Sequence, residues 1–440
     1  IAPELKAFEI VPVQPTFTHT LEPARPVQGR VTDKETGKPL AGMLVEMIPM
    51  RSHGGYGFRG KTDADGRFRI SGHRGLSYMT NVYPRADSGY LPAGGTQGWP
   101  AGAKFLEVNF ALEKGRLISG RVIDRDTKKP IPGAAVMYQT SQKNPKDKYR
   151  YDFRNTVLTD REGKFTITGL AGDGMLVVEV PDPDAMRIPI TATMYGRLAY
   201  PHGSISVNIP KDGEPKPVEI NVRKGVTIEA RVVDQSGAVV PDVVAFYPGI
   251  SACLIDVWNQ GQEIFDSPFR IRGADPQKTY RVWFLQPERK LGAIATLKYD
   301  ANHPGPIDVH LQPTASVHGK VSGAVPQSCQ VYANLVLAQD RKHLSERDLQ
   351  NQDLVEFYAN ILGQRHMNLL KEQPESNGAF TLDTLIPGSD LYVTAATRGG
   401  RGAHVPVLDI KPGENRDLGT LVLQERKPPS RSPKSTHAGE

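Results

Sequence analysis

The feature that most constrains the fold is a stretch that occurs twice in the chain. Residues 29–45 read GRVTDKETGKPLAGMLV, and residues 120–136 read GRVIDRDTKKPIPGAAV. In each copy a short apolar run leads into a polar turn that contains Asp, and Pro and Gly precede a second apolar run. Turn residues between two apolar runs are typical of two strands joined by a tight connection. The sequence therefore predicts a β-hairpin at each copy.

A second repeated block follows each copy. It reads TDADGRFRISG at residues 62–72 and TDREGKFTITG at residues 159–169. Asp and Gly are the residues of a tight turn, and the positions after the turn alternate between apolar and polar. This alternation predicts a buried row of apolar side chains in the strand of each copy: Phe68 and Ile70, and Phe165 and Ile167.

Weaker copies of the same pattern occur later, at residues 230–245 and 319–335, and residues 376–382 restore the second block. A period of roughly 90 to 110 residues is the size of one small domain, so the chain is an array of repeated domains. The expected parts are an extended lead-in, four β-sandwich repeats and a disordered basic tail, at residues 1–23, 24–113, 114–224, 225–313, 314–425 and 426–440.

Short strands separated by turn residues predict an all-β fold of four tandem antiparallel β-sandwiches, transthyretin-like or Ig-like. The fourth repeat carries the one helical signal. Apolar residues recur there at helical spacing after Ser345, which predicts a helical insertion at about 345–370: Leu354, Phe357, Tyr358 and Ile361. Closing and opening strands are separated by few residues, as at 112–117, which predicts an array with limited bending.

Composition and charge exclude several kinds of partner and site. The chain has 440 residues and a formal net charge of +6. No recognised nucleic-acid-binding motif accompanies this mild positive charge, so no nucleic-acid partner is expected. No apolar run is long enough for a membrane-spanning helix. Cys253 and Cys329 are too few for a disulfide framework or a cysteine zinc site. The chain begins at Ile1 without a leader, so a removed signal segment and an excised piece are both open.

The repeated motifs resemble those of the carboxypeptidase regulatory-like domain family, which has a transthyretin-like sandwich. The matching positions are the Gly, Val, Asp, Pro and Gly of residues 29–45 and the Thr, Asp, Gly, Phe and Ile of residues 62–72, with their counterparts in the second copy. One departure is Lys128, which stands where the first copy has Gly37, so that turn must differ or hold a non-Gly residue in an unfavourable conformation. The resemblance implies a non-catalytic, extracytoplasmic array at the periplasm or cell surface, in some relatives carried behind a membrane metallopeptidase.

Motifs for catalysis are missing from the sequence. No His-Glu-x-x-His pair occurs, and His303, His310 and His318, even with Asp308, have no spacing that makes them converge. A partial Tyr-Tyr-His pattern of intradiol dioxygenases, at Tyr195, Tyr200 and His202, lacks the second His. Residues 63–66 read as a turn and not as a calcium loop. We therefore expect no catalytic residue, no metal site and no cofactor.

Two groups of aromatic residues are candidate ligand contacts. Tyr90 and Trp99 flank a loop rich in Gly and Pro, where exposed rings could stack on sugars. Tyr149, Tyr151 and Phe153 alternate with basic residues, and could form either an exposed ledge or the buried face of a strand. The favoured function is a monomeric spacer that binds a protein or a cell-surface polysaccharide. The alternatives are a carbohydrate-binding array and the accessory region of a membrane-anchored metallopeptidase.

Overall fold

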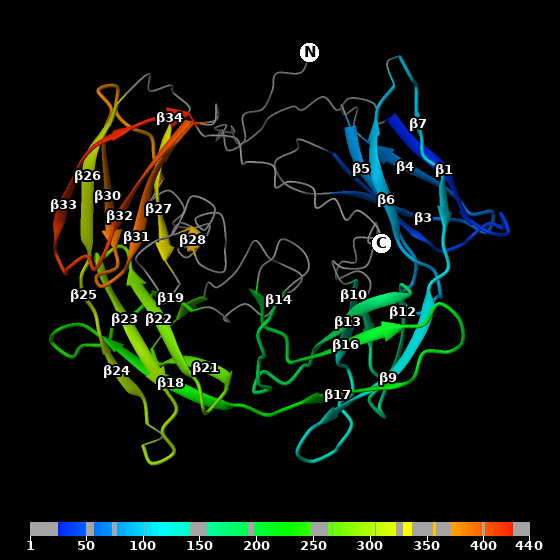
Figure 1. The fold of residues 1–440 in the computed structure, drawn as a ribbon, viewed down its shortest axis with the longest axis horizontal. Coiled ribbons are helices and arrows are strands. Elements are labelled where there is room, and N and C mark those ends of the chain that lie inside the picture. The colour runs from blue at the N-terminus through cyan, green and yellow to red at the C-terminus, as the bar shows by residue number, and fades with distance from the viewer. Residues whose placement is uncertain are drawn as a thin grey trace, which may run out of the picture. The chain divides into compact units, whose positions relative to one another are not determined.

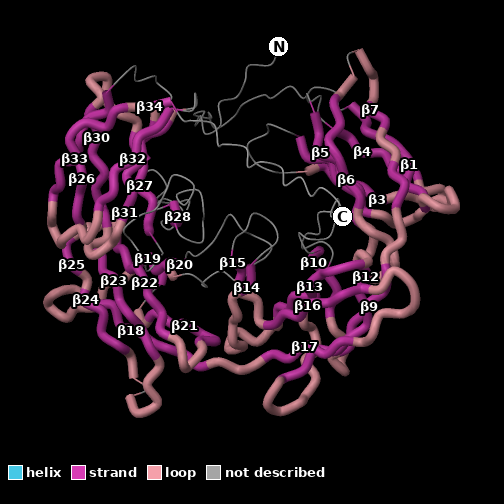
Figure 2. Tube along the Cα trace, viewed as in Figure 1, coloured by secondary structure: helices cyan, strands magenta, loops and turns pink. Residues whose placement is uncertain are grey.

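The computed structural model describes residues 25–49, 57–72, 77–100, 102–140, 156–191, 198–247, 263–265, 267–303, 305–322, 329–336, 355–357, 371–397 and 401–425. Every regular element in these ranges is a strand (Figure 2). The chain forms two compact units. Unit 1 comprises Ile1–Pro181 and Gly203–Val222, and unit 2 comprises Asp182–His202 and Arg223–Glu440.

The first repeat is a sandwich of two sheets (Figure 1). One sheet has the order β4-β1-β7, with β8 also on β1: Arg67–Gly72, Arg25–Asp33, Leu106–Glu107 and Phe110–Leu112. The other has the order β3-β2-β5-β6: Phe58–Lys61, Leu44–Pro49, Ser77–Tyr83 and Ala93–Gly98. Inward side chains of both sheets form one apolar cluster that includes Val31, Val45, Phe68 and Tyr78. The two sheets therefore share one core.

The second repeat has the same two sheets within unit 1. The first is ordered β12-β9-β17: Lys164–Gly169, Arg116–Asp124 and Val218–Val222. The second is ordered β11-β10-β13-β16: Thr156–Leu158, Ala135–Thr140, Gly172–Glu179 and Gly203–Ile209. Phe165 and Ile167 are buried, as are Phe68 and Ile70, so the predicted inward rows are confirmed.

Unit 2 contains the third repeat, preceded by a separate two-stranded ribbon. The ribbon is β14-β15, Ile190–Thr191 and Leu198–Ala199. The first sheet of the repeat is ordered β21-β18-β24: Phe269–Ala274, Val226–Val233 and Ile307–His310. The second is ordered β20-β19-β22-β23-β25: Glu263–Phe265, Val243–Phe246, Thr279–Gln286, Leu291–Lys298 and Gln312–Pro313.

The fourth repeat follows in the same unit. One sheet is ordered β30-β26-β33: Ala379–Leu385, Ala315–Ser322 and Asn415–Val422. The other is ordered β28-β27-β31-β32-β34, with β29 also on β27: Val355–Phe357, Gln330–Val336, Leu391–Ala396, Arg401–Val407, Gln424–Glu425 and Lys371–Glu372. The described chain is thus built from several β-sandwiches.

The predicted hairpins at residues 29–45 and 120–136 are wrong in their pairing. Strands β1 and β2 belong to different sheets, and a single bridge between Thr32 and Pro39 connects the two sides of the turn. Alternation of apolar residues identifies the buried face of a strand but not its hydrogen-bonded neighbour. The repeated stretch therefore carries the chain across the core from one sheet to the other.

The prediction of purely antiparallel sandwiches is also corrected. Each closing strand runs parallel to the opening strand of its repeat: β7 and β8 along β1, β17 along β9, β24 along β18, and β33 along β26. A parallel pair requires a crossover connection, and here the whole second sheet provides it. Buried and exposed side chains alternate along the closing strands of the first repeat as expected, and Leu106, Phe110 and Leu112 are buried.

The predicted helical insertion is wrong where the structure describes it. Val355–Phe357 forms β28 and pairs antiparallel with β27, Asn334 lying opposite Phe357. Val and Phe fit a pleated sheet, and the ladder of β27 supplies partners for the backbone that a helix would satisfy locally. Residues 345–354 and 358–370 lie outside the described residues, as do the predicted lead-in 1–23 and tail 426–440.

The two strong copies share one turn conformation. Asp33 Oδ1 accepts hydrogen bonds from the N–H groups of Glu35 and Thr36, and Asp124 Oδ1 accepts the equivalent pair in the second copy. Gly37 has a φ of 65°, and Lys128, at the same position, has a φ of 58°. The non-Gly residue expected in an unfavourable conformation is therefore present, and the turn itself is unchanged.

Candidate functional site

The first junction between repeats joins β8 to β9 through residues 113–115 alone. The loop of residues 84–92 pairs with this linker. Tyr90 forms an antiparallel bridge with Lys114, the Leu91 N–H donates to the Glu113 carbonyl at 2.9 Å, and the Gly115 N–H donates to the Gly89 carbonyl at 2.8 Å. The linker is therefore a paired segment, unlike a flexible tether.

Thr168 of β12, in the second repeat, contacts loop 84–92 of the first repeat at this junction. Its side chain is buried, its N–H donates to the Ala86 carbonyl at 2.6 Å, and its hydroxyl oxygen accepts the Gly89 N–H at 3.0 Å. A Cβ on Gly115 would lie 2.6 Å from Thr168 Cγ2 and 2.7 Å from Leu91 Cδ2. Only glycine fits, so the two repeats of unit 1 meet in a packed contact.

A buried carboxylate joins the first turn to the same junction. The Tyr90 hydroxyl donates to Asp33 Oδ2 at 2.8 Å, and Lys114 Nζ lies 3.6 Å from the same oxygen. Hydrogen bonds from the Thr36 N–H and the Tyr90 hydroxyl hold the pKa of Asp33 well below its ordinary value. The same carboxylate raises the pKa values of Tyr90 and Lys114.

The aromatic candidates Tyr90 and Trp99 both contact the core of the first repeat. Trp99 Nε1 donates to the Ala103 carbonyl at 3.2 Å, and its ring lies 6.2 Å from the ring of Tyr78. Each ring thus has a structural partner on one side. A ligand contact at either ring stays a prediction.

Unit 2 repeats the junction arrangement where segment 182–202 meets the third repeat. Lys224 forms a bridge with Ala185, and the Gly225 N–H donates to the Asp184 carbonyl at 2.8 Å. A Cβ on Gly225 would lie 2.4 Å from the carbonyl carbon of Gly273. The Lys-Gly pair thus occupies the same place in both linkers, at 114–115 and 224–225, and the sequence alone gives no indication of the contacts that it makes.

The third and fourth repeats share apolar packing. Phe246, Trp283 and Leu285 of the third repeat belong to the same cluster as buried residues of β26, β27, β30 and β31. Lys290 Nζ also lies 2.7 Å from Asp383 Oδ2, and the Thr314 N–H donates to the Lys290 carbonyl at 2.8 Å. Burial of apolar area across this junction opposes its opening.

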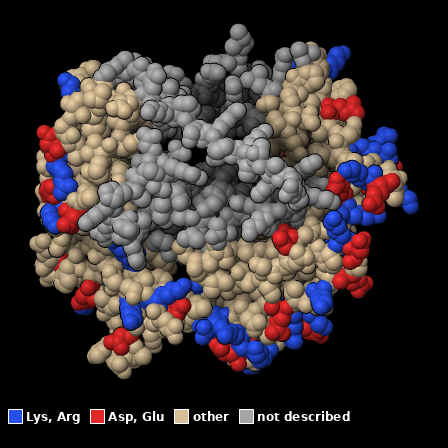
Figure 3. All heavy atoms as spheres, in the orientation of Figure 1, with Lys and Arg blue, Asp and Glu red and all other residues tan. Residues whose placement is uncertain are grey.

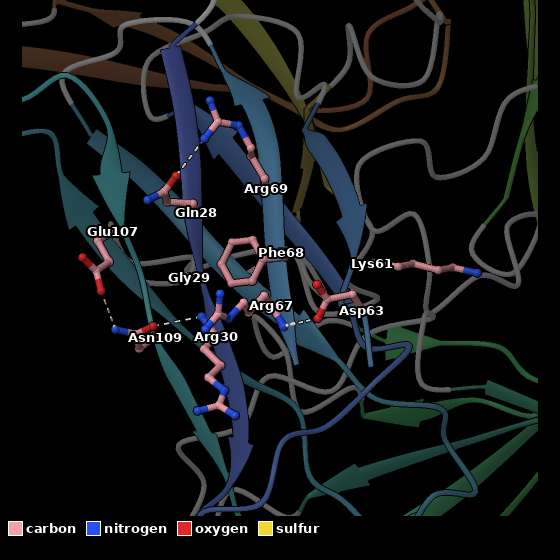
Figure 4. A pocket seen from close by; sticks show the side chains of 10 residues that line it. All are labelled: Gln28, Gly29, Arg30, Lys61, Asp63, Arg67, Phe68, Arg69, Glu107 and Asn109. Carbon is pink, nitrogen blue, oxygen red and sulfur yellow. Dashed lines mark hydrogen bonds between the residues drawn. The ribbon is translucent and has the colours of Figure 1, made fainter. Parts of the chain in front are cut away.

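A polar hollow of about 600 Å³ lies on the outer face of the first repeat, over β4, β1 and β7 (Figure 4). Ten residues line it: Gln28, Gly29, Arg30, Lys61, Asp63, Arg67, Phe68, Arg69, Glu107 and Asn109. Among these residues, the ring of Phe68 packs against Gly29. Sequence reasoning identified this strand by its inward row and did not consider its outward arginines.

Two of the three histidines considered for a metal site have hydrogen-bond partners outside that group. His303 Nδ1 lies 3.0 Å from Asp300 Oδ2, and His318 Nδ1 lies 2.9 Å from Asn415 Oδ1. Asp308 forms an ion pair with Arg231. Within the described ranges no group of three or more His, Cys, Asp or Glu side chains could hold a metal ion. Asp63 Oδ1 accepts the N–H groups of Asp65 and Arg67, so this carboxylate shapes the turn at 63–66.

Of the remaining candidate residues, some lie within the described ranges and others lie outside them. Tyr149, Tyr151 and Phe153 lie outside the described residues, as do Tyr195 and Cys253. The second aromatic group therefore stays a prediction. Cys329 is a buried free thiol whose pKa is raised by burial.

Comparison with known proteins gives only distant likeness. No known protein family matches the chain, and no curated protein matches it. Among solved structures, a shaft pilin of Lactobacillus rhamnosus GG aligns over 46% of this chain and 98% of its own, with 14% identity and a TM-score of 0.20. A streptococcal ancillary pilin aligns over 65% and 98%, with 12% identity and a TM-score of 0.28.

A minor pilin of Streptococcus agalactiae aligns over 46% of this chain and 97% of its own, with 13% identity and a TM-score of 0.20. TM-scores this low do not establish a shared arrangement over the aligned lengths. No functional statement about this chain follows from them.

Charged side chains of both signs are interspersed over the described surface on the face seen in Figure 3. In the described ranges no helix is long and apolar enough to cross a membrane.

Proposed function

We propose that the chain is a non-catalytic, extracytoplasmic array of four sandwich repeats, at 24–113, 114–224, 225–313 and 314–425, that serves as a spacer and binds a partner. The observation that supports the spacer role is the packed junction around Gly115. A linker whose glycine has no room for a Cβ, and whose backbone is paired with loop 84–92, holds its neighbours at one angle.

Similar contacts between repeats occur at other linkers of the chain, and this supports the proposal. Lys224 and Gly225 repeat the contacts of Lys114 and Gly115, and the third and fourth repeats share an apolar cluster. Inter-domain contacts that bury little apolar area normally permit domain motion. The paired junction in unit 1 and the apolar contact between the third and fourth repeats in unit 2 instead favour fixed spacing of the repeats within each unit. The extracytoplasmic setting is carried over from the resemblance of the repeat motifs to carboxypeptidase regulatory-like domains.

The test is a distance distribution between two spin labels in unit 1 of the full chain. Labels at Lys38→Cys and Arg161→Cys, two exposed turn positions, would be placed in a Cys253→Ser/Cys329→Ala background. We expect one narrow distribution. A four-residue Gly/Ser insertion between Glu113 and Lys114 should broaden it, since the linker can no longer pair with loop 84–92.

The control is the same insertion beside Gly213, in an exposed turn where a Cβ on the glycine would meet nothing within 4 Å and where the Arg116 side chain donates to the carbonyl oxygen. This insertion should leave the distribution narrow. A broad distribution in the chain without any insertion would disprove the rigid-spacer proposal.

A further inference from the structure

The outward row of strand β4 places two arginines on one face of the first repeat. Arg67 and Arg69 are two positions apart on an extended strand, so their Cβ atoms lie about 7 Å apart on the same side. Arg30 of β1 is the direct cross-strand partner of Arg67. All three arginines therefore line the hollow over β4 and β1, one after another along the two strands (Figure 4).

Like charges that face each other across a ladder destabilise a sheet unless an anion compensates them. Arg30 Nε donates to the Asp65 carbonyl, and Arg69 Nη1 donates to Gln28 Oε1, so neither uses a carboxylate. In the part of the chain that the structure describes, the Arg67 side chain has no hydrogen bond or ion pair. Within the described residues, none of the three guanidinium groups is paired with a carboxylate.

Two carboxylates line the hollow, and both accept hydrogen bonds from groups other than the arginine side chains. Asp63 accepts backbone N–H groups at its own turn, and Glu107 accepts the Asn109 side-chain amide at 3.1 Å. Glu107 lies on β7, across β1 from the arginines of β4. Lys61 lines the rim, and in Figure 4 its side chain points away from the other basic groups.

At the same positions in the second and third repeats, basic side chains form ion pairs with glutamates. In the second repeat, Lys164 replaces Arg67 and pairs with Glu162, and Thr166 replaces Arg69. In the third repeat, Arg270 replaces Arg69 and pairs with Glu229, its direct cross-strand partner, at 2.6 Å. The first repeat has Gln28 where the third has that glutamate. Its arginines are thus available to an external anion.

We propose that this surface, defined by Arg30, Arg67 and Arg69, binds an extended acidic peptide segment of a partner protein. Arginine forks hold carboxylates through paired hydrogen bonds. Carboxylates at alternate positions of an extended peptide project from one side about 7 Å apart, which matches the spacing of Arg67 and Arg69. The hollow has no exposed aromatic ring, since Phe68 is buried, and this favours a peptide over a sugar chain.

This proposal deepens the partner-binding part of the proposed function and rests on it. The probe is a short, blocked, fluorescent peptide in which Glu alternates with Thr, titrated with the full chain by fluorescence anisotropy at low salt. We expect binding that weakens as salt rises. The Arg67→Ala/Arg69→Thr variant should bind about tenfold more weakly or worse, because charge-assisted hydrogen bonds are lost.

A matched control removes the same two charges from the corresponding strands of other repeats, as Lys164→Ala/Arg270→Thr. Its affinity should stay within about twofold of the original chain. A peptide with Gln in place of Glu should not bind. Circular dichroism and thermal melting confirm that each variant is folded, which is expected because the replaced side chains are exposed.

Two outcomes would each overturn the proposal. The chain could fail to bind the acidic peptide, whether or not it binds polygalacturonate, or the control variant could lose as much affinity as the test variant. The junction distance distribution is a separate readout that these variants should not alter. Failure of the acidic-peptide surface is therefore distinguishable from failure of the spacer proposal.

Discussion

Gly120 and Phe165 are direct partners across the β9–β12 ladder, and a Cβ on Gly120 would lie 2.4 Å from Phe165 Cζ. Gly29 and Phe68 form the same pair in the first repeat, and Gly319 and Phe380 in the fourth. The repeated Gly and Phe of the two sequence blocks are thus one structural unit. An aromatic ring covers a glycine on the neighbouring strand, and this packing explains why both residues recur.

Replacing Gly120 by Ala should destabilise the second repeat by about 1–3 kcal/mol, because the added methyl group meets the Phe165 ring and the Val218 carbonyl oxygen. Urea denaturation measures the change in the free energy of unfolding. Gly95→Ala is the control, since nothing lies within 4 Å of the Cβ at that position. An equal effect of both substitutions would exclude steric overlap as the cause.

Phe165→Ala should cost about 3–5 kcal/mol, since a buried ring is lost from the core. Adding Gly120→Ala in the Phe165→Ala background should cost less than Gly120→Ala alone, because the ring that it strikes is gone. The double-mutant cycle measures this coupling. Strict additivity of the two free-energy changes would show that the pair does not act as a unit.

Lys128→Gly should stabilise the chain by a few tenths of a kcal/mol and by at most about 1 kcal/mol, because relief of the left-handed conformation is partly offset by the flexibility of glycine in the unfolded chain. The reciprocal change, Gly37→Lys, should destabilise the equivalent turn by a similar amount. Both are read from chemical denaturation midpoints. If both changes had the same sign, backbone conformation would not be the controlling factor.

Stability should fall in acid partly through Asp234. Its pKa is lowered to about 2 by hydrogen bonds from the Ser236 hydroxyl and the Arg289 guanidinium. A carboxylate with a lowered folded-state pKa stabilises the fold above its unfolded value, near 4, and this contribution is lost as the pH falls from about 4 towards 2.

Asp234→Asn should therefore show a smaller loss of unfolding free energy over this pH range than the original chain, in urea titrations at several pH values. Asp212→Asn serves as the control, because that exposed carboxylate has no described partner. A pH dependence that is the same in the Asp234→Asn and Asp212→Asn variants would contradict the assignment.

Sequence patterns predicted the repeat, the buried rows and the strained turn residue Lys128, because these depend on local periodicity and backbone conformation. The pairing of strands was not predictable in the same way. The connection from β1 to β2 has the composition of a hairpin turn, yet its two strands belong to different sheets. Which strand lies beside β1 is decided by core packing between distant residues such as Val31 and Phe110.

The contacts at the junctions and on the arginine surface were harder still to predict. The Lys-Gly pairs of the linkers are visible in the sequence, but their meaning depends on Thr168 and Gly89, which approach only in the folded chain. The arginines of β4 are ordinary outward residues of a strand until the register places Arg30 opposite Arg67. The helix expected near Phe357 shows that helical spacing over a few residues is weak against an available sheet partner.

The parallel pairing of first and last strands has a mechanical consequence. Because β8 runs in the same direction as β1, the chain enters a repeat at one end of that sheet and leaves it at the other. A pulling force on the two ends would slide the two strands along each other, so their ladder hydrogen bonds would resist together and would not open one at a time. The same geometry at β9 and β17, β18 and β24, and β26 and β33 makes every repeat suited to carry tension.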